Sequence, residues 1–352
     1  MERLEVSNLR CIEHAVLELC AGTNLISGAN GAGKTTLLEA VHVLGRGHSF
    51  RVRDNRRLIR RQSEGFWVRG AFGAQTRPRR LGVGYERGTL DVRIDGEAGR
   101  RASQLAECLP VEIVDVAAHR LIDGGPTERR RFVDWGLFHV EPDYVTHWRA
   151  YRRTLVQRNE ALRREVGDAE LDVWDASLVQ AGMALEVART RFVARWAERA
   201  HGIAKSLLGG EIELVYRRGT VGDMPLEEAL KKARGRDRER GQTLAGPHRA
   251  DVAVRYGGGL AREVASRGQQ KLLAAALILA RLTDRLDRGG RAGMLLVDDP
   301  IAELDAESLD RLLGVLQSVP VQTIVTALDP GRLDAMSISR QFHVEHGVIR
   351  PV

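Results

Sequence analysis

Residues 28–35 read GANGAGKT, and this stretch decides which fold the chain is expected to adopt. It satisfies every fixed position of the G-x-x-x-x-G-K-[S/T] pattern, whose glycines let backbone N–H groups close around phosphate oxygens. The run 23–27, which is expected to form a strand, precedes the loop, and a segment of helical character, 35–44, follows it. A Gly-rich turn could match by chance, but a strand before the loop and a helix after it are the context that phosphate binding requires. The chain is therefore expected to bind a nucleotide.

The residues of this loop have separate expected roles. The ammonium of Lys34 would reach the β- and γ-phosphates, and the hydroxyl of Thr35 would bind Mg²⁺. ATP and Mg²⁺ are therefore the expected cofactors. The expected contacts to the nucleotide are Gly28, Ala29, Asn30, Gly31, Ala32, Gly33, Lys34, Thr35 and Thr36.

Two adjacent acids follow an apolar run, residues 294–297, which read MLLV. Such a run is typical of a buried parallel strand, and ligands bind at the carboxyl ends of such strands. Asp298 is expected to hold Mg²⁺ through water, and Asp299 to position or deprotonate the attacking water. Two acids alone could end a strand in a solvated turn, but their pairing with the phosphate loop favours a metal site.

The rest of the chain alternates between β-rich and helical segments. Patterns of period two predict short strands at both ends of the sequence. Helices are expected over residues 126–138, 142–166 and 171–208, followed by a strand over 211–216 and a charged helix from Leu226. The simplest architecture is one α/β domain made from both chain ends and interrupted by a mainly helical insert.

Composition narrows the class of protein. Among 352 residues, 54 Lys and Arg against 47 Asp and Glu give a net charge of +7, which suits a polyanionic partner. No apolar run reaches the about 18 residues of a membrane span, and the first residues lack a signal-peptide layout. Cys11, Cys20 and Cys108 have no metal-ligand or redox spacing. We expect buried thiols in a reducing compartment, and hence a cytoplasmic protein.

A further motif lies between the helical segments and the paired acids, where residues 265–271 read ASRGQQK ahead of an apolar helix. It resembles the signature motif of the ABC ATPase superfamily, in which a serine and a glycine at a helix N-terminus contact the γ-phosphate bound to the opposite subunit. By this resemblance Ser266, Gly268 and Gln269 would contact ATP in trans. Residues 302–305, AELD, resemble the superfamily's D-loop. The candidate catalytic residues are accordingly Lys34, Asp298, Asp299, Ser266 and Asp305.

Over its whole length the chain resembles the RecF family of bacterial DNA replication and repair proteins. The segments that carry the resemblance are residues 25–35, 92–96, 121–126, 129–136, 246–251, 266–269 and 298–299. The resemblance implies an ABC-type P-loop ATPase head formed by residues 1–122 and 245–352, with a helical insert domain over residues 123–244. The second part of the head would carry the signature, the strand acids and the D-loop.

The same resemblance implies a function in recombinational gap repair and replication. The protein would dimerise on ATP, bind single-stranded, duplex or gapped DNA, help to load RecA at gaps with RecR and RecO, and support SOS induction. The alternative is an ATP-binding subunit of an ABC transporter. The basic charge, the helical insert and the absence of the transporter histidine, where Thr326-Ala327-Leu328 stand, favour DNA binding.

The chain departs from the family at one motif. Val116-Ala117 stand where many RecF sequences have a Pro-Glu pair, so a nucleotide-sensing role of that glutamate is absent. Asp299 is also one methylene shorter than the glutamate usual at its position. We expect slow, DNA-stimulated ATP hydrolysis that serves as a switch.

Two basic runs are candidate DNA-binding surfaces. Residues 46–61 hold seven arginines and one acid, and arginine suits bidentate contacts to phosphates, although such a run can also be a solvated face. The run 231–240 resembles a mobile loop. The aromatic side chains of the insert, Trp148, Tyr151 and Trp196 among them, are expected to pack in the core rather than to stack on bases. The expected DNA-binding residues are Arg51, Arg53, Arg56, Arg57, Arg60 and Arg61.

Overall fold

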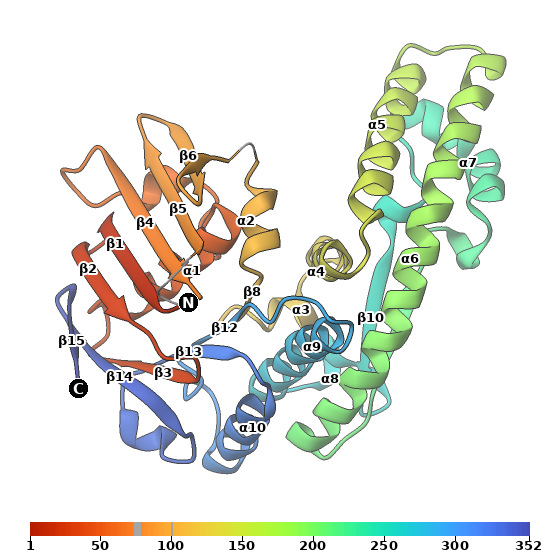
Figure 1. The fold of residues 1–352 in the computed structure, drawn as a ribbon. Coiled ribbons are helices and arrows are strands. Elements are labelled where there is room, and N and C mark those ends of the chain that lie inside the picture. The colour runs from red at the N-terminus through yellow and green to blue at the C-terminus, as the bar shows by residue number, and fades with distance from the viewer. Residues whose placement is uncertain (74–78, 100) are drawn as a thin grey trace. The chain divides into compact units, whose positions relative to one another are not determined.

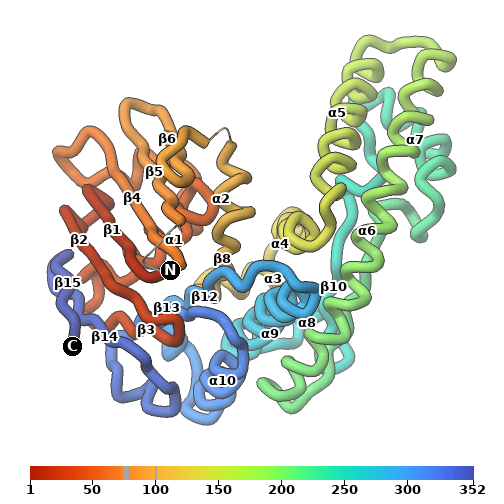
Figure 2. Tube along the Cα trace, in the orientation of Figure 1, coloured from red at the N-terminus to blue at the C-terminus, as the bar shows by residue number. Residues whose placement is uncertain are grey.

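A computed structural model of the chain describes residues 1–73, 79–99 and 101–352, which form two compact units (Figure 1). Unit 1 consists of Met1–Ala118 and Arg291–Val352, and unit 2 of His119–Gly290. The red N-terminal and blue C-terminal segments thus belong to the same unit (Figure 2). The predicted domain boundaries at residues 122 and 245 stay a prediction. The two units are defined by contacts between residues, and such units need not coincide with domains.

Within the described residues, unit 1 holds two six-stranded sheets. The antiparallel sheet has the order β2-β1-β4-β5-β6-β7 and comprises β1 (Arg3–Leu9), β2 (Ile12–Glu18), β4 (Gly65–Phe72), β5 (Arg79–Glu86), β6 (Thr89–Ile94) and β7 (Glu97–Ala98). The mixed sheet has the order β15-β14-β3-β13-β12-β8 and comprises β3 (Thr23–Ser27), β8 (Val111–Val114), β12 (Met294–Asp298), β13 (Gln322–Ala327), β14 (Ile338–Glu345) and β15 (Val348–Pro351).

The strands of the mixed sheet position the phosphate loop. β3, β13 and β12 are parallel neighbours, so their carboxyl ends meet at one edge of the sheet. In this register Thr326 lies opposite Asp298, and Ala327 lies opposite Ser27, the last residue of β3. The apolar run at residues 294–297 is completely buried, as the sequence predicts for an inner parallel strand.

Helix α1 (Lys34–Arg46) contacts strands of both sheets. Its apolar residues Leu37, Leu38, Val41 and Leu44 are fully buried in the core of unit 1. Burial of each such side chain stabilises the fold by about 1.5–3 kcal/mol, so the beginning of the helix is firmly placed. The other helical segments of unit 1 are α2 (Ser103–Cys108), α10 (Ala306–Ser318), η1 (Asn55–Leu58) and η4 (Pro330–Leu333).

Unit 2 is mainly helical, with a three-stranded sheet of order β11-β10-β9. The long helix α6 packs against α5 and α9, and the indole N–H of the buried Trp196 donates to the Leu277 carbonyl oxygen at 2.9 Å. The elements are α3 (Arg120–Asp123), α4 (Pro126–Val140), α5 (Tyr144–Arg163), α6 (Asp168–Leu208), β9 (Ile212–Arg217), η2 (Val221–Asp223), α7 (Leu226–Arg240), η3 (Pro247–Arg249), β10 (Asp251–Tyr256), β11 (Gly259–Leu260), α8 (Ala261–Val264) and α9 (Arg267–Asp287).

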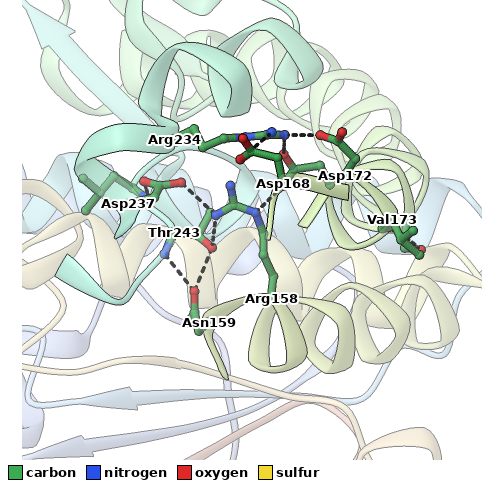
Figure 3. A network of polar contacts seen from close by, with 11 residues as sticks. Arg158, Asn159, Asp168, Asp172, Val173, Arg234, Asp237 and Thr243 are labelled. Atoms are coloured by element: carbon green, nitrogen blue, oxygen red, sulfur yellow. Dashed lines mark hydrogen bonds and ion pairs between the residues drawn. The ribbon is translucent and has the colours of Figure 1, made fainter. Parts of the chain in front are cut away.

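A buried polar network joins α5, α6 and α7 (Figure 3). The Arg158 guanidinium, 0% exposed, contacts Asp175 of α6 at 2.5 Å and Asp237 of α7 at 2.7 Å. It also donates to the Thr243 hydroxyl at 2.8 Å, which in turn donates to Asn159 at 2.7 Å. One cation between two carboxylates therefore links three helices of unit 2.

The structure corrects the expectation of a mobile loop over residues 231–240. This run belongs to α7, and four of its six cations pair with acids of α7 or α6. Lys231 and Lys232 pair with glutamates one turn earlier, at 2.7 and 2.6 Å, and such i,i+4 pairs support a helix. Arg234 and Arg238 reach acids at the beginning of α6. The prediction of a charged helix from Leu226 is confirmed.

The structure also corrects the expectation that all three thiols are buried. Cys11 is exposed, because it lies with Arg10 in the tight turn between β1 and β2. Cys20 and Cys108 are partly exposed. The Cys11 sulfur lies 3.8 Å from the Thr36 hydroxyl oxygen, next to the phosphate loop.

Candidate nucleotide-binding site

The phosphate loop joins β3 to α1 in unit 1. Its glycines Gly28, Gly31 and Gly33 have φ angles of 149°, 78° and 123°, in the region that favours glycine. A Cβ atom at Gly28 would lie 2.2 Å from the Val344 carbonyl oxygen of β14, so a larger residue would displace the loop. The Gly347 N–H donates to the Ala32 carbonyl oxygen at 2.9 Å. The β14–β15 hairpin therefore supports the loop. No motif in the sequence indicates this support.

Lys34 begins α1, and its side chain turns back across the loop. Its ammonium donates to the carbonyl oxygens of Gly28 at 2.7 Å and Ala29 at 3.0 Å. An ammonium has three donors, so one remains for a phosphate oxygen. Burial lowers the pKa of Lys34 from its ordinary value, and the carboxylates of Asp299 and Asp298 oppose this shift. The loop thus has a well-placed cation with acids nearby.

The structure brings Thr35 and Asp298 together from opposite parts of the sequence. The Thr35 hydroxyl oxygen lies 3.0 and 3.1 Å from the two carboxylate oxygens of Asp298. The Thr326 hydroxyl donates to the same carboxylate at 2.8 Å, and it accepts the backbone N–H of Asp299 at 3.0 Å. Two strands, β12 and β13, and the beginning of α1 therefore meet at one carboxylate.

Thr326 is a residue of this site that the sequence analysis did not assign. Its hydroxyl orients Asp298 and holds the backbone of Asp299, whose φ of 47° places it in a turn directly after β12. The sequence feature that could have indicated this role is the position of Thr326 at the end of the strand 322–326, where a transporter ATPase carries its histidine. Strands β13 and β12 are neighbours in the sheet, and their register places Thr326 opposite Asp298. The sequence alone does not specify this pairing.

The residues present fit a magnesium ion. Mg²⁺ prefers hard oxygen ligands and is usually held by one or two protein oxygens together with phosphates and water. Thr35 offers a hydroxyl and Asp298 a carboxylate, at the N-terminus of α1 where phosphates also bind. Among the residues that the structure describes, no cluster of three or more His, Cys, Asp or Glu side chains could hold another metal.

Asp305 has a structural contact in unit 1. It is the N-cap of α10, where its carboxylate accepts the Ser308 N–H and hydroxyl, both at 2.9 Å. These hydrogen bonds lower the pKa of Asp305, the backbone one contributing most. A capping role accounts for an acid at this position, and the catalytic role that the resemblance implies stays a prediction.

The signature segment begins α9 of unit 2. Ser266 is the N-cap and forms a capping box with Gln269, in which the serine oxygen accepts the Gln269 N–H at 3.3 Å and the Gln269 side chain accepts the Ser266 N–H at 2.9 Å. Ser266 is exposed, and neighbouring Arg267 pairs with Asp123 at 2.9 Å. A capping hydroxyl still has its own proton to donate. The segment is therefore an ordered, accessible helix N-terminus.

The first basic run lies on unit 1, around η1. Arg56 donates to the Tyr85 hydroxyl at 3.3 Å, and Arg60 pairs with Glu13 at 2.9 Å. The exposed side chains Arg51, Arg53, Arg57 and Arg61 form no ion pair within the part of the chain that the structure describes. Within the described residues, five of the six predicted DNA-binding arginines thus keep their charge unpaired, because the Tyr85 hydroxyl that Arg56 contacts is neutral.

Comparison with known proteins identifies the family. The sequence profile described as the RecF/RecN/SMC N terminal domain matches residues 1–350. A protein of Thioalkalivibrio sulfidiphilus named DNA replication and repair protein RecF is 38% identical, over 99% of both chains. Its namesake in Xanthomonas euvesicatoria pv. vesicatoria is 40% identical, over 99% of this chain and 97% of its own. The chain belongs to the RecF family.

Solved structures agree with this family on the fold. A structure of the recombination mediator protein RecF with ATP, in the RecFOR pathway, covers 100% of the chain and 97% of its own, with a TM-score of 0.87 and 24% identity. An SMC head bound to the C-winged helix domain of ScpA gives 0.62 and 16% identity, over 100% and 96%. The predicted ABC-type α/β head with a helical insert and the predicted RecF resemblance are confirmed.

RecF membership supports ATP binding and ATPase activity, and it does not favour the transporter alternative. None of the helices in the described residues is long and apolar enough to cross a membrane.

Proposed function

We propose that this RecF-family protein is a cytoplasmic, ATP-controlled DNA-binding protein of replication and recombinational gap repair. It dimerises on ATP, helps to load RecA at single-strand gaps together with RecR and RecO, and supports SOS induction. The contact of Thr35 with Asp298 carries the ATP-dependent part, because it joins the phosphate loop to the strand acid as MgATP binding requires. Family membership supports the repair role and the partners.

In this proposal each polar residue of the site has one task. The backbone N–H groups of residues 28–36 and the Lys34 ammonium bind the phosphates. Thr35 and Asp298 hold Mg²⁺, which when bound neutralises charge on the phosphate oxygens. Asp299 accepts a hydrogen bond from the attacking water, and Thr326 fixes both acids. Because Asp299 is shorter than a glutamate, hydrolysis is slow, as in a switch, and the proposed DNA-binding function adds stimulation by DNA.

The signature acts in trans in the proposed dimer. Ser266, Gly268 and Gln269 present a hydroxyl and a helix N-terminus at an exposed position, which suits the terminal phosphate of ATP on a second copy. A two-fold arrangement lets each subunit complete the site of the other. Asp305, which fixes the beginning of α10, is proposed to contribute from the D-loop.

We propose that the basic run of unit 1 contacts DNA phosphates. Arg51, Arg53, Arg57 and Arg61 supply the larger share, because Arg56 and Arg60 already bind Tyr85 and Glu13. Such contacts are independent of base sequence and weaken as salt rises.

Sedimentation with ATP tests the dimer, and ATPase stimulation by gapped DNA tests the switch. Ser266→Arg should abolish the ATP-dependent dimer and hydrolysis while the monomer still binds ATP. Ser206→Arg, at an exposed serine of α6, is the matched control and should dimerise like the wild type. A normal dimer in Ser266→Arg would refute the trans arrangement, and an ATPase indifferent to DNA would refute the DNA switch.

A further inference from the structure

Helix α5 of unit 2 carries three exposed arginines on one face. Arg149, Arg152 and Arg153 are three and four residues apart, so they lie on the same side of the helix. Among the residues that the structure describes, no carboxylate forms an ion pair with any of them. The strip continues through Val156, which is 58% exposed, and the next acid along it, Glu160, is paired with Arg163 at 3.2 Å. The middle of α5 therefore presents uncompensated positive charge.

Helix α7 of the same unit is also basic, but most of its cations are paired with carboxylates. Lys231, Lys232 and Arg238 each lie within 2.7 Å of a carboxylate oxygen, on Glu227, Glu228 and Asp168. Surface pairs of this kind reduce the field that reaches solvent. The α7 run is richer in cations by sequence, but four of its six cations form ion pairs and, within the described residues, only Arg236 and Arg240 form none, whereas none of the three α5 arginines is paired. The pairing, rather than the count of basic residues, separates the two helices.

The arginine Arg152 is held in place by an aromatic ring. Its guanidinium carbon lies 4.9 Å from the ring centroid of Trp148, one turn earlier on α5. Stacking uses the face of the guanidinium and leaves its N–H donors, which lie in its plane, available for hydrogen bonds. The stacked side chain also loses less conformational entropy when it binds an anion. Trp148 is half-buried, which departs from the core position predicted for it, whereas Tyr151 and Trp196 are buried as predicted.

We propose that this face of α5, formed by Arg149, Arg152 and Arg153 with Trp148 beneath Arg152, binds the phosphate backbone of duplex DNA. The inference rests on the proposed DNA-binding function and adds a second contact surface, on the helical unit, to the arginine run of unit 1. Arg149 and Arg153 are separated by about 6 Å along the helix axis. Duplex DNA carries one charge per about 1.7 Å of its axis, so neighbouring phosphates are within reach of the strip.

The chemistry of the strip favours the backbone over bases or an acidic protein. Arg152 covers one face of the Trp148 ring, so that face offers no platform for a base. An acidic protein surface would be best held by a basic rim around an apolar centre, and the single exposed apolar side chain of the strip, Val156, lies beside the arginines rather than among them. A linear set of planar, bidentate donors matches phosphate oxygens.

The test is a titration of a gapped duplex at several salt concentrations, with ATP and Mg²⁺ present. In the variant Arg149→Ala/Arg152→Ala/Arg153→Ala, the slope of log K against log [salt] should fall by about 2 to 3, because each lost phosphate contact contributes about 0.9. The matched control is Lys231→Ala/Lys232→Ala/Arg238→Ala, which removes the same charge from the paired cations of α7. Its slope should stay within about 0.5 of the wild type.

A further variant keeps the test decisive if the triple variant is unstable. Trp148→Leu keeps all three charges and removes the stacking, so affinity should fall while the slope stays nearly constant. Equal slopes for the α5 triple variant and the wild type, or equal losses in the α5 and α7 triples, would overturn the proposal. So would loss of poly-glutamate binding with unchanged DNA binding, which would assign the strip to an acidic protein. If the wild type itself bound no DNA, the proposed function would fail instead.

Discussion

The polar network around the phosphate loop and the one around Arg158 differ in how their charges are balanced. Around the phosphate loop, Lys34 lies near two acids, Asp298 and Asp299, and keeps a donor for a ligand. In the helical unit, Arg158 is fully buried and divided between Asp175 and Asp237. The first network is arranged to receive phosphate and metal, and the second pairs its charges with one another inside the fold. Substitutions in the first should therefore cost function, and substitutions in the second should cost stability.

The largest expected effect comes from Lys34. In Lys34→Ala, ATP affinity should fall about a hundredfold or more, because the one free ammonium donor makes a charge-assisted hydrogen bond that contributes about 1.5–3 kcal/mol, and without the cation Asp298 and Asp299 repel the phosphates. The melting temperature should stay near that of the wild type, since removal of a buried ammonium leaves only carbonyl oxygens to be solvated. Nucleotide titration and a melting curve measure both quantities. Unchanged ATP affinity would contradict the assignment of the loop.

Arg158→Met tests the other side of the comparison. It leaves two carboxylates buried without their cation, which costs about 3–5 kcal/mol of unfolding free energy. Denaturant titration followed by tryptophan fluorescence reports mainly on unit 2, which holds Trp135, Trp148, Trp174 and Trp196. ATP binding in native buffer should persist.

Lys231→Met is the control for Arg158→Met, because it removes a cation from an exposed pair and should cost no more than about 0.5 kcal/mol. If both variants were equally stable, the buried network would not be what holds α5, α6 and α7 together.

The two adjacent acids should separate metal binding from hydrolysis. In Asp299→Asn the water loses its acceptor, so ATP hydrolysis should fall about a hundredfold while MgATP still binds and the dimer persists. The Asp298 carboxylate contacts Thr35 and Thr326, so the variant Asp298→Asn should need a higher Mg²⁺ concentration for ATP binding. Single-turnover hydrolysis and Mg²⁺ titrations measure the two effects. Wild-type hydrolysis in both variants would show that neither acid has its proposed role.

Local patterns predicted much of the nucleotide site, because its main parts are short motifs. The loop 28–35 and the acids 298–299 each carry their own signal, and so does the strand before each. Thr326, the support of the loop by Val344 and Gly347, and the acids facing α7 depend on register and on helix packing. Those partners lie far apart in sequence and leave no local pattern. The run 231–240, expected to be a mobile loop, is instead part of α7, where Asp168 and Asp172 of α6 pair with its Arg234 and Arg238.

The smallest expected effect concerns His248, in the segment 246–251 that carries the family resemblance. Its Nε2 lies 3.0 Å from the Thr243 carbonyl oxygen, which can only accept, so Nε2 carries the proton and Nδ1 accepts the Tyr151 hydroxyl at 2.7 Å. A neutral ring fits this arrangement, and burial is the main cause that lowers the pKa of His248 to about 4, with Arg249, Arg130 and Arg158 acting in the same direction.

The sign of the pH dependence follows from that shift. Between the unfolded pKa of about 6.5 and the folded value of about 4, the unfolded chain binds a proton that the folded chain does not. The contribution of His248 to stability is therefore complete above pH 6.5 and falls as the pH drops toward 4, by at most about 3 kcal/mol.

His248→Gln keeps a neutral polar side chain without the titration, so its unfolding free energy should depend less on pH across this window than that of the wild type. Denaturant titrations at pH 7, 6, 5 and 4.5 compare the two slopes, which are independent of any constant loss of stability in the variant. Parallel slopes would mean that the ring titrates alike in both states, and then the segment 246–251 would owe its stability to Arg189, which donates to the Pro247 carbonyl oxygen at 2.6 Å, rather than to the neutral histidine.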